Sequence, residues 1–198
     1  MSAHSEHYLT GDEEKTLLQI ARASLEAYTR ERREIDLDEF PLTDALIERH
    51  GAFVTLRNRG HLRGCIGYTT NSAPLAEAVC ENAINAAARD PRFMPVTPEE
   101  LPEITIEISA LTPGETPETP FKRINDISEI VLGRDGLYIE RPPHRGGLLL
   151  PQVPVEQDWD LIQFLAGVCR KAGYPDGAWK DKATLLYRFS AQVFSEKE

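Results

Sequence analysis

The stretch Leu62–Gly67 reads Leu-Arg-Gly-Cys-Ile-Gly and places one thiol between two glycines, two residues after an arginine. A cysteine reacts as its thiolate, and a nearby guanidinium such as that of Arg63 lowers a thiol pKa. Glycines beside Cys65 let a ligand or another backbone approach closely. These residue types predict Cys65 as a catalytic nucleophile, with Arg63 and Gly64 contacting an anionic substrate. The competing interpretation is structural, because a cysteine within a strand is often buried.

Two other clusters carry side chains suited to an anion. Asp90 and Arg92 flank a proline, so they either face a ligand or simply pair with each other. His144 and Arg145 stand in a glycine-rich turn, which suits an anion but is also a common loop composition. We include Asp90, Arg92 and His144 as candidate substrate contacts, although neither cluster is specific by itself.

The residue patterns of common metal and cofactor sites are missing. The three cysteines, Cys65, Cys80 and Cys169, are far apart, and no Cys-x-x-Cys pair or Cys/His cluster occurs. This spacing argues against structural zinc and against a disulfide framework. The sequence also lacks a dinucleotide-binding glycine loop, a Walker loop and any Cys-His dyad visible from spacing. It therefore predicts no metal site and identifies no cofactor.

Charge and hydropathy limit the partners. A net charge of −10 and a pI near 5.1 argue against duplex DNA, which needs an extended basic surface. The same charge disfavours RNA but leaves a local single-strand site open. No apolar run approaches the ~18 residues that span a bilayer, and the N-terminus lacks the apolar region of a signal peptide. We therefore expect a reducing, cytoplasmic setting.

Residues 52–67 predict a β-hairpin, and its register decides which side chains share a face. A three-residue loop pairs Thr55 with Arg63 and Phe53 with Cys65. It also gathers four apolar residues on the opposite face: Val54, Leu56, Leu62 and Ile66. A two-residue loop would set apolar residues of one strand beside polar residues of the other. Because a one-residue slip inverts every side chain, we favour the three-residue loop and expect Arg63 and Cys65 on the same face.

Helices and short strands are interspersed along the 198 residues. Thr10 and Glu13 fit a capping box that opens a helix, and Thr97 and Glu100 fit a second one. Helical periodicity is expected to about residue 33, at 71–90 and at 159–172. Alternation predicts strands at 104–109, 185–194 and, more briefly, 129–132, 137–141 and 147–150. The predicted fold class is α+β, an antiparallel sheet flanked by helices with a second, smaller lobe of short strands.

With these segments in place, the chain resembles the AMMECR1 domain family. The resemblance covers roughly residues 12–195 and is highly specific in its order of motifs. Those motifs are Leu62–Gly67, Ala88–Phe93, Pro98–Leu101, Gly147–Val153, Trp159–Asp160 and Cys169–Gly173. The likeness is greatest to the prokaryotic single-domain members called AmmeMemoRadiSam system protein A.

The resemblance implies a single domain over residues 1–198 with two lobes, the larger formed from both chain ends and the smaller inserted. It places the Leu62–Gly67 motif close to a cleft and adds Gln152 to the candidate substrate contacts. It also suggests Memo-like and radical-SAM proteins as partners, while the reaction and the oligomeric state stay open.

Three functions therefore compete. In the first, the protein is an enzyme or enzyme component, with Cys65 as nucleophile or redox thiol and Arg63 holding an anionic substrate. In the second, it is a non-catalytic module that presents Arg63, Arg92 and His144 to a small anion, a peptide or a partner enzyme. In the third, the Leu62–Gly67 motif is only a packing motif, whose glycines allow a close approach of chain segments.

Overall fold

The computed structural model describes residues 8–114, 116 and 119–196. The chain divides into two compact units, each with its own hydrophobic core. Unit 1 is the described part of Met1–Leu111 and Gln192–Glu198, and unit 2 is the described part of Thr112–Ala191. Among the helices of the described residues, none combines the length and apolar character that crossing a membrane requires.

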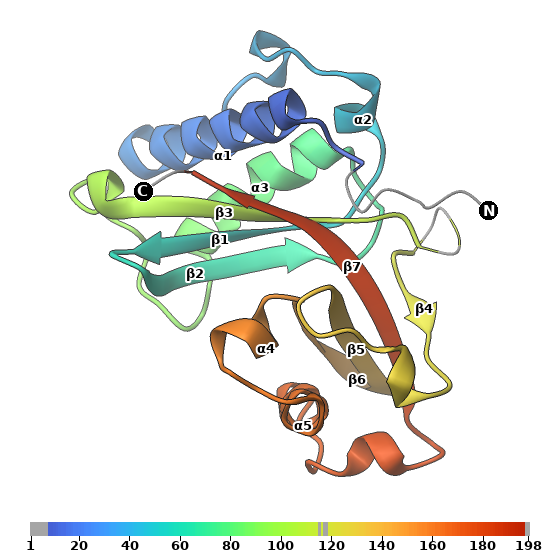
Figure 1. Cartoon of the computed structure of the whole chain (residues 1–198). Coiled ribbons are helices and arrows are strands. Elements are labelled where there is room, and N and C mark those ends of the chain that lie inside the picture. Colours follow the sequence, from blue (N-terminus) through green and yellow to red (C-terminus); the bar gives the residue numbers. More distant parts are fainter. Residues whose placement is uncertain (1–7, 115, 117–118, 197–198) are drawn as a thin grey trace. The chain divides into compact units, whose positions relative to one another are not determined.

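Figure 1 shows the elements in chain order. Unit 1 contains α1 (Gly11–Glu31), η1 (Leu37–Glu39), α2 (Asp44–Ile47), β1 (Ala52–Asn58), β2 (His61–Tyr68), α3 (Leu75–Ala88), η2 (Leu101–Glu103) and β3 (Ile104–Leu111). Unit 2 contains β4 (Lys122–Arg123), η3 (Ile127–Glu129), β5 (Asp135–Arg141), β6 (His144–Leu149), α4 (Val153–Glu156), α5 (Leu161–Lys171) and η4 (Ala178–Lys180). The last strand, β7 (Leu185–Ser195), begins in unit 2 and ends in unit 1.

Helix α1 begins and ends where its sequence directs. The Thr10 hydroxyl accepts the Glu13 amide proton, and the Thr10 amide donates to the Glu13 carboxylate at 2.7 Å, which completes the predicted capping box. The helix closes at Arg32, whose left-handed φ of 54° ends the backbone pattern. Its buried stripe includes Leu17 and Leu25, which are fully inaccessible to solvent.

The sheet of unit 1 is antiparallel, in the order β2-β1-β3 followed by the end of β7. Helices α1 and α3 pack on each other and cover one face of this sheet (Figure 1). Alternate residues of β1 and β3 point to the helices, and four of them have no solvent exposure: Val54, Leu56, Ile106 and Ile108. The period-2 pattern of residues 104–109 therefore marks a real half-buried strand.

The hairpin of β1 and β2 forms, but the predicted register is wrong. Its turn has two residues, Arg59 and Gly60, with φ values of 49° and 78°. Two successive left-handed residues match the right-handed twist of flanking strands. The observed partner of Cys65 is Thr55, where the three-residue loop had predicted Phe53.

A β-bulge explains this error. Leu62 pairs with Arg57 and Gly64 pairs with Leu56, so Arg63 is one extra residue in β2. The bulge restores the apolar match that a two-residue turn alone would lose, because Ile66 then stands beside Val54. Leu62 lies before the bulge and is 40% exposed, so its expected place on the buried face is wrong.

Unit 2 has an antiparallel sheet in the order β4-β7-β5-β6. Helix α5 contributes Phe164, Leu165 and Val168 to its core, beside Leu137 and Ile139 of β5. The short strands expected at 137–141 and 147–150 correspond to β5 and the end of β6. The strand expected at 129–132 does not form, because Asp126 and Glu129 make a capping box for η3.

The observed architecture confirms the predicted fold class. Helices and antiparallel strands are segregated as in an α+β protein, with one helical layer on the sheet of unit 1. The motif Leu62–Gly67 lies entirely within β2, which is an edge strand of that sheet. The residues that pack against the unpaired edge of β2 therefore determine the environment of Cys65.

Candidate functional site

The two glycines of the motif stand in close contacts, Gly64 with α3 and Gly67 with β1. A Cβ atom placed on Gly64 would overlap the carbonyl oxygen of Ala86 in α3, and one placed on Gly67 would overlap the ring of Phe53. Both neighbours are held by the core, so neither can easily withdraw. Gly64 thus serves the close approach of two backbones, which accounts for its residue type without any ligand.

Asp90, just beyond the end of α3, binds the backbone at Cys65. The Cys65 amide donates to Asp90 Oδ2 at 2.9 Å, and the amide of Arg92 donates to Asp90 Oδ1 at 3.1 Å. The Asp90 side chain is only 2% exposed. Because an edge strand carries unpaired backbone groups, this carboxylate replaces the neighbour that β2 lacks.

Arg92 completes the arrangement. Its Nε donates to Asp90 Oδ1 at 2.9 Å and its Nη2 to Asp90 Oδ2 at 2.6 Å. The same Nη2 reaches the Cys65 carbonyl oxygen at 3.3 Å. These hydrogen bonds from Arg92, with those from the Cys65 and Arg92 amides, lower the pKa of Asp90 from 3.8 to about 2. We call the set of Asp90, Arg92 and the Cys65 backbone the edge clamp.

Arg63, the arginine of the Leu62–Gly67 motif, is also paired with a carboxylate of the same chain. Arg63 donates from Nε and Nη2 to the two oxygens of Glu100, at 2.7 and 3.0 Å. This fork-shaped pair lowers the pKa of Glu100, chiefly through the Arg63 hydrogen bonds. Arg63 and Arg92 both lie over the ring of Phe93, with centroid distances of 5.9 and 5.4 Å. Within the described residues, Arg63 Nη1 is buried and makes no hydrogen bond.

The Cys65 thiol has a different set of neighbours. Thr55, its cross-strand partner, donates from Oγ1 to the sulfur at 3.3 Å. Burial raises the pKa of the thiol above its ordinary value, and Thr55 and Arg92 offset this only in part. Asp90 and Glu107 add negative charge that raises the pKa further. The thiol is therefore held in its protonated, weakly nucleophilic form.

This result corrects one expectation for Arg63. The guanidinium that lowers the Cys65 pKa belongs to Arg92, and the net shift is upward. The Arg63 side chain contacts Glu100 and Phe93, whereas the Cys65 sulfur contacts Thr55. The bulge at Arg63 and the ion pair give the two side chains different partners.

The seven candidate residues divide between the units. Arg63, Gly64, Cys65, Asp90 and Arg92 gather along β2 in unit 1. His144 opens β6 in unit 2, and its side chain lies outside the described part of the structure. Gln152 precedes α4, also in unit 2. The geometry described for the edge clamp is complete within unit 1.

Three residues of the site were not singled out for it from the sequence. Thr55 becomes a thiol partner only through the observed register, and Phe93 becomes a platform only when two arginines reach it. For Glu100 the sequence contained one indication, the spacing of Thr97 and Glu100. The Glu100 carboxylate accepts the Thr97 amide at 2.8 Å, but no helix begins at Thr97, and the next element is η2 at Leu101. Among the described residues, no group of three or more His, Cys, Asp or Glu side chains is arranged to hold a metal ion.

Comparisons with known proteins identify the family. The AMMECR1 family model matches residues 18–194. A protein of Methanothermobacter thermautotrophicus is 47% identical over 188 residues, covering 95% of this chain and 96% of the relative. The crystal structure of the uncharacterized protein PH0010 from Pyrococcus horikoshii superposes with a TM-score of 0.81 at 41% identity, covering 91% of this chain and 90% of that one. The chain belongs to the AMMECR1 family.

Proposed function

We propose that this chain is a non-catalytic protein-binding component whose contact surface is the 92–94 loop, formed by Arg92, Phe93 and Met94. The observation that carries the proposal is the internal pairing of the motif's charges. Arg63 is bound by Glu100 and Arg92 by Asp90, and the Cys65 thiol stays protonated. A site built for thiol catalysis would instead direct positive charge toward the sulfur.

The 92–94 loop is held rigidly and ends in an exposed apolar side chain. The Phe93 amide donates to the Asp90 carbonyl at 3.1 Å, and the Val96 amide donates to Ala87 of α3 at 2.8 Å. Met94 between them is 81% exposed. Methionine, arginine and aromatic residues are enriched at protein interfaces, and a pre-organised loop loses little entropy on binding.

We propose Memo-like and radical-SAM proteins as the partners. This choice rests on the resemblance to prokaryotic members of the family, for which association with both kinds of protein is expected. In this proposal the chain positions a partner enzyme and the partner carries out the chemistry. The edge clamp then has the task of keeping the 92–94 loop in one conformation.

Binding to purified Memo-like and radical-SAM proteins tests the proposal, measured by calorimetry under reducing, anaerobic conditions. Met94→Asp should weaken binding at least tenfold, because it places a charge at the apolar contact. Val155→Asp is the matched control, since Val155 is also exposed, at 65%, but lies in α4 of unit 2. Cys65→Ser should leave the affinity unchanged. Loss of binding in a folded Cys65→Ser protein, or retention in Met94→Asp, contradicts the proposal.

Thiol chemistry is the second candidate function, and two observations favour it. Arg92 lowers the Cys65 pKa to some extent, and the buried Arg63 Nη1 makes no hydrogen bond within the described residues. That donor could bind an oxygen of an anionic substrate. In this alternative, Cys65 is the nucleophile or redox thiol and Arg63 holds the substrate.

The rate of Cys65 alkylation against pH separates the two candidates. The binding proposal expects alkylation slower than that of a free thiol with a pKa of about 8.5, because burial keeps the proton on sulfur. A fast reaction near neutral pH would favour the enzyme. The packing interpretation concerns different residues, Gly64 and Gly67, and is compatible with either candidate.

A further inference from the structure

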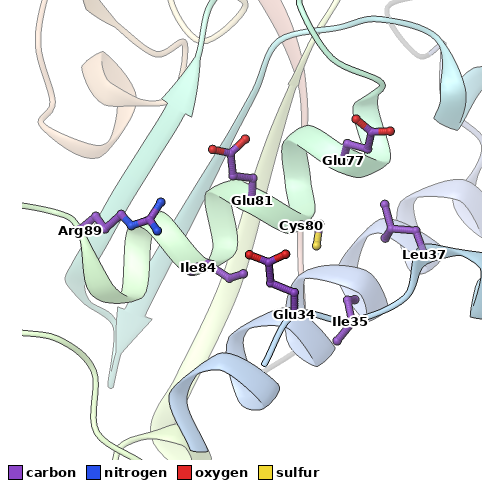
Figure 2. A pocket seen from close by; sticks show the side chains of 8 residues that line it. All are labelled: Glu34, Ile35, Leu37, Glu77, Cys80, Glu81, Ile84 and Arg89. Atoms are coloured by element: carbon purple, nitrogen blue, oxygen red, sulfur yellow. The ribbon is translucent and has the colours of Figure 1, made fainter. Parts of the chain in front are cut away.

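Unit 1 contains a pocket of about 360 Å³ between α3 and the segment that follows α1. Figure 2 shows its lining side chains, which come from residues 34, 35 and 37, from α3, and from Arg89 just after α3. Ligand pockets begin at about 300 Å³, so this one suits a small group. None of its lining residues belongs to the edge clamp, although Arg89 directly precedes Asp90, and neither candidate function above uses the pocket.

Part of the lining is apolar. Ile35 and Leu37 face Ile84 of α3, and Cys80 lies between them (Figure 2). The Cys80 sulfur accepts a hydrogen bond from Ser24 at 3.0 Å, and burial raises the pKa of the thiol. This side of the pocket is apolar and carries no charged side chain. It therefore suits an aliphatic chain.

The remaining lining is strongly negative. Glu34, Glu77 and Glu81 contribute three carboxylates, and all three raise the Cys80 pKa through their charge. Glu77 and Glu81 are four residues apart on α3, a spacing at which like charges repel. Within the described residues, Glu34 and Glu77 make no ion pair.

The single cation of the lining does not balance these charges. Arg89 donates to the side chain of Asn85 at 2.9 Å, and Glu81 accepts the Tyr68 hydroxyl at 3.0 Å. Formal charge in the lining is therefore −2, from three glutamates and one arginine. A cation would relieve the repulsion, whereas an anion would add to it.

We propose that this pocket binds an alkylammonium group carried on an apolar stem. The stem packs on Ile35, Leu37 and Ile84, and the ammonium reaches Glu34 and Glu77. A divalent metal does not fit as well, because no metal-ligand arrangement of His, Cys, Asp and Glu occurs among the described residues. Two sources carry the same chemistry: a free aliphatic amine, and a lysine side chain of another protein.

Cys80 provides a reporter inside the pocket. The purified protein is treated with iodoacetamide at about pH 8, where an alkylammonium is still protonated, and alkylation is mapped to each cysteine by mass spectrometry. Pentylamine should slow alkylation of Cys80 at least threefold and leave Cys65 unchanged. Pentanol, of the same length but neutral, should have no effect. Calorimetric titration with both compounds gives a readout that does not depend on thiol reactivity.

Two further probes distinguish the sources. Spermidine represents a free amine, and an acetylated, amidated Gly-Lys-Gly peptide represents a protein lysine. Protection by either one identifies the source and supports the proposal. Equal effects of pentylamine and pentanol, or no effect of any amine in both readouts, overturns it.

Charge variants complete the test. A Glu34→Gln, Glu77→Gln protein should lose at least tenfold in pentylamine affinity, because both unpaired carboxylates are neutralised. Asp12→Asn is the matched control: it removes one charge from the first turn of α1, at the other end of that helix from the pocket. Undiminished affinity in the double variant, or an equal loss in Asp12→Asn, contradicts an ammonium site between these glutamates.

Discussion

The edge clamp and the acidic pocket both belong to unit 1, and each contains a cysteine whose pKa is raised by burial. They differ in charge balance and in space. At the clamp, Asp90 is matched by Arg92, and the backbone of β2 lies directly on α3. At the pocket, three glutamates face one arginine around an open volume of about 360 Å³.

This difference separates a structural cluster from a binding site better than residue type does. Cys65 lies in the more distinctive sequence, but its polar neighbours satisfy one another. Cys80 lies in an ordinary helical sequence, but the carboxylates around it lack partners of opposite charge. Uncompensated charge beside free volume favours a ligand, whereas charges already paired in a filled space leave no group for a ligand to bind and are costly to separate.

The largest effect on stability is expected at Gly64, where β2 and α3 are in direct contact. Gly64→Ala should lower the free energy of unfolding by about 3 kcal/mol, because the new methyl group must displace the backbone of α3. Gly11→Ala is the control, since nothing lies within 4 Å of its added Cβ. Urea denaturation measures both. A Gly64→Ala protein as stable as Gly11→Ala would show that the close approach has no energetic importance.

The next effect is the pH dependence of the clamp. The Asp90 pKa falls from 3.8 to about 2 in the folded protein, so folding favours the ionised carboxylate. This contribution is complete above about pH 4 and is lost as the pH falls toward about 2. At about 1.4 kcal/mol for each pKa unit, the loss is roughly 2 kcal/mol.

Asp90→Asn removes the titrating group and tests this assignment. Its stability should be lower than that of the unmodified protein near neutral pH, and the difference should shrink steadily on acidification. Denaturation series at several pH values measure the two slopes. Identical slopes in both proteins would show that Asp90 is not the group responsible.

A smaller coupling is expected between Arg63 and Glu100. Their side chains are 15% and 26% exposed, and their two-pronged geometry should give a coupling of about 1 kcal/mol in a double-mutant cycle with alanine. The matched control is the ion pair of Arg59 and Glu103, because Arg59 belongs to the turn of the same hairpin. It is 75% and 49% exposed, so its coupling should vanish in physiological salt. Equal coupling in the two pairs would argue against a special role for Arg63.

The smallest effect has the opposite sign. A double-mutant cycle of Glu77→Gln and Glu81→Gln should show a repulsive coupling of about 0.3 kcal/mol in low salt, because like charges four residues apart on α3 repel each other. The cycle cancels the separate interaction of Glu77 with the N-terminal end of α3. The coupling should disappear in about 0.5 M salt as the charges are screened. An absent or attractive coupling in low salt would mean that the pocket's charges are balanced, and the contrast with the clamp would fail.

Local chemistry made parts of this fold predictable. Thr10 and Glu13 are three residues apart and form their capping box as expected. The alternation through Ile104, Ile106 and Ile108 needs only neighbouring residues to define a half-buried strand. The pairing of Asp90 with Arg92 was also available as one of two interpretations, because the residues are two apart.

The hairpin register could not be predicted from the hairpin sequence alone. A two-residue turn with a bulge and a three-residue loop without one both keep Val54 and Leu56 on the apolar face. In the observed register, the bulge residue Arg63 pairs with Glu100, which is 37 residues away in the chain. The pattern of apolar and polar residues within the hairpin carries no information about that interaction, because Glu100 lies outside the hairpin.

The sequence by itself determined the family, the α+β class and the positions of most helices and strands, since these follow from ordered motifs and short-range periodicity. Only the tertiary structure decided what the motif residues do. It brought Asp90 to the backbone of Cys65, Glu100 to Arg63, and Glu34 to the glutamates of α3. Charge compensation and burial depend on neighbours distant in sequence, and these two quantities decide whether a thiol reacts and whether a pocket binds.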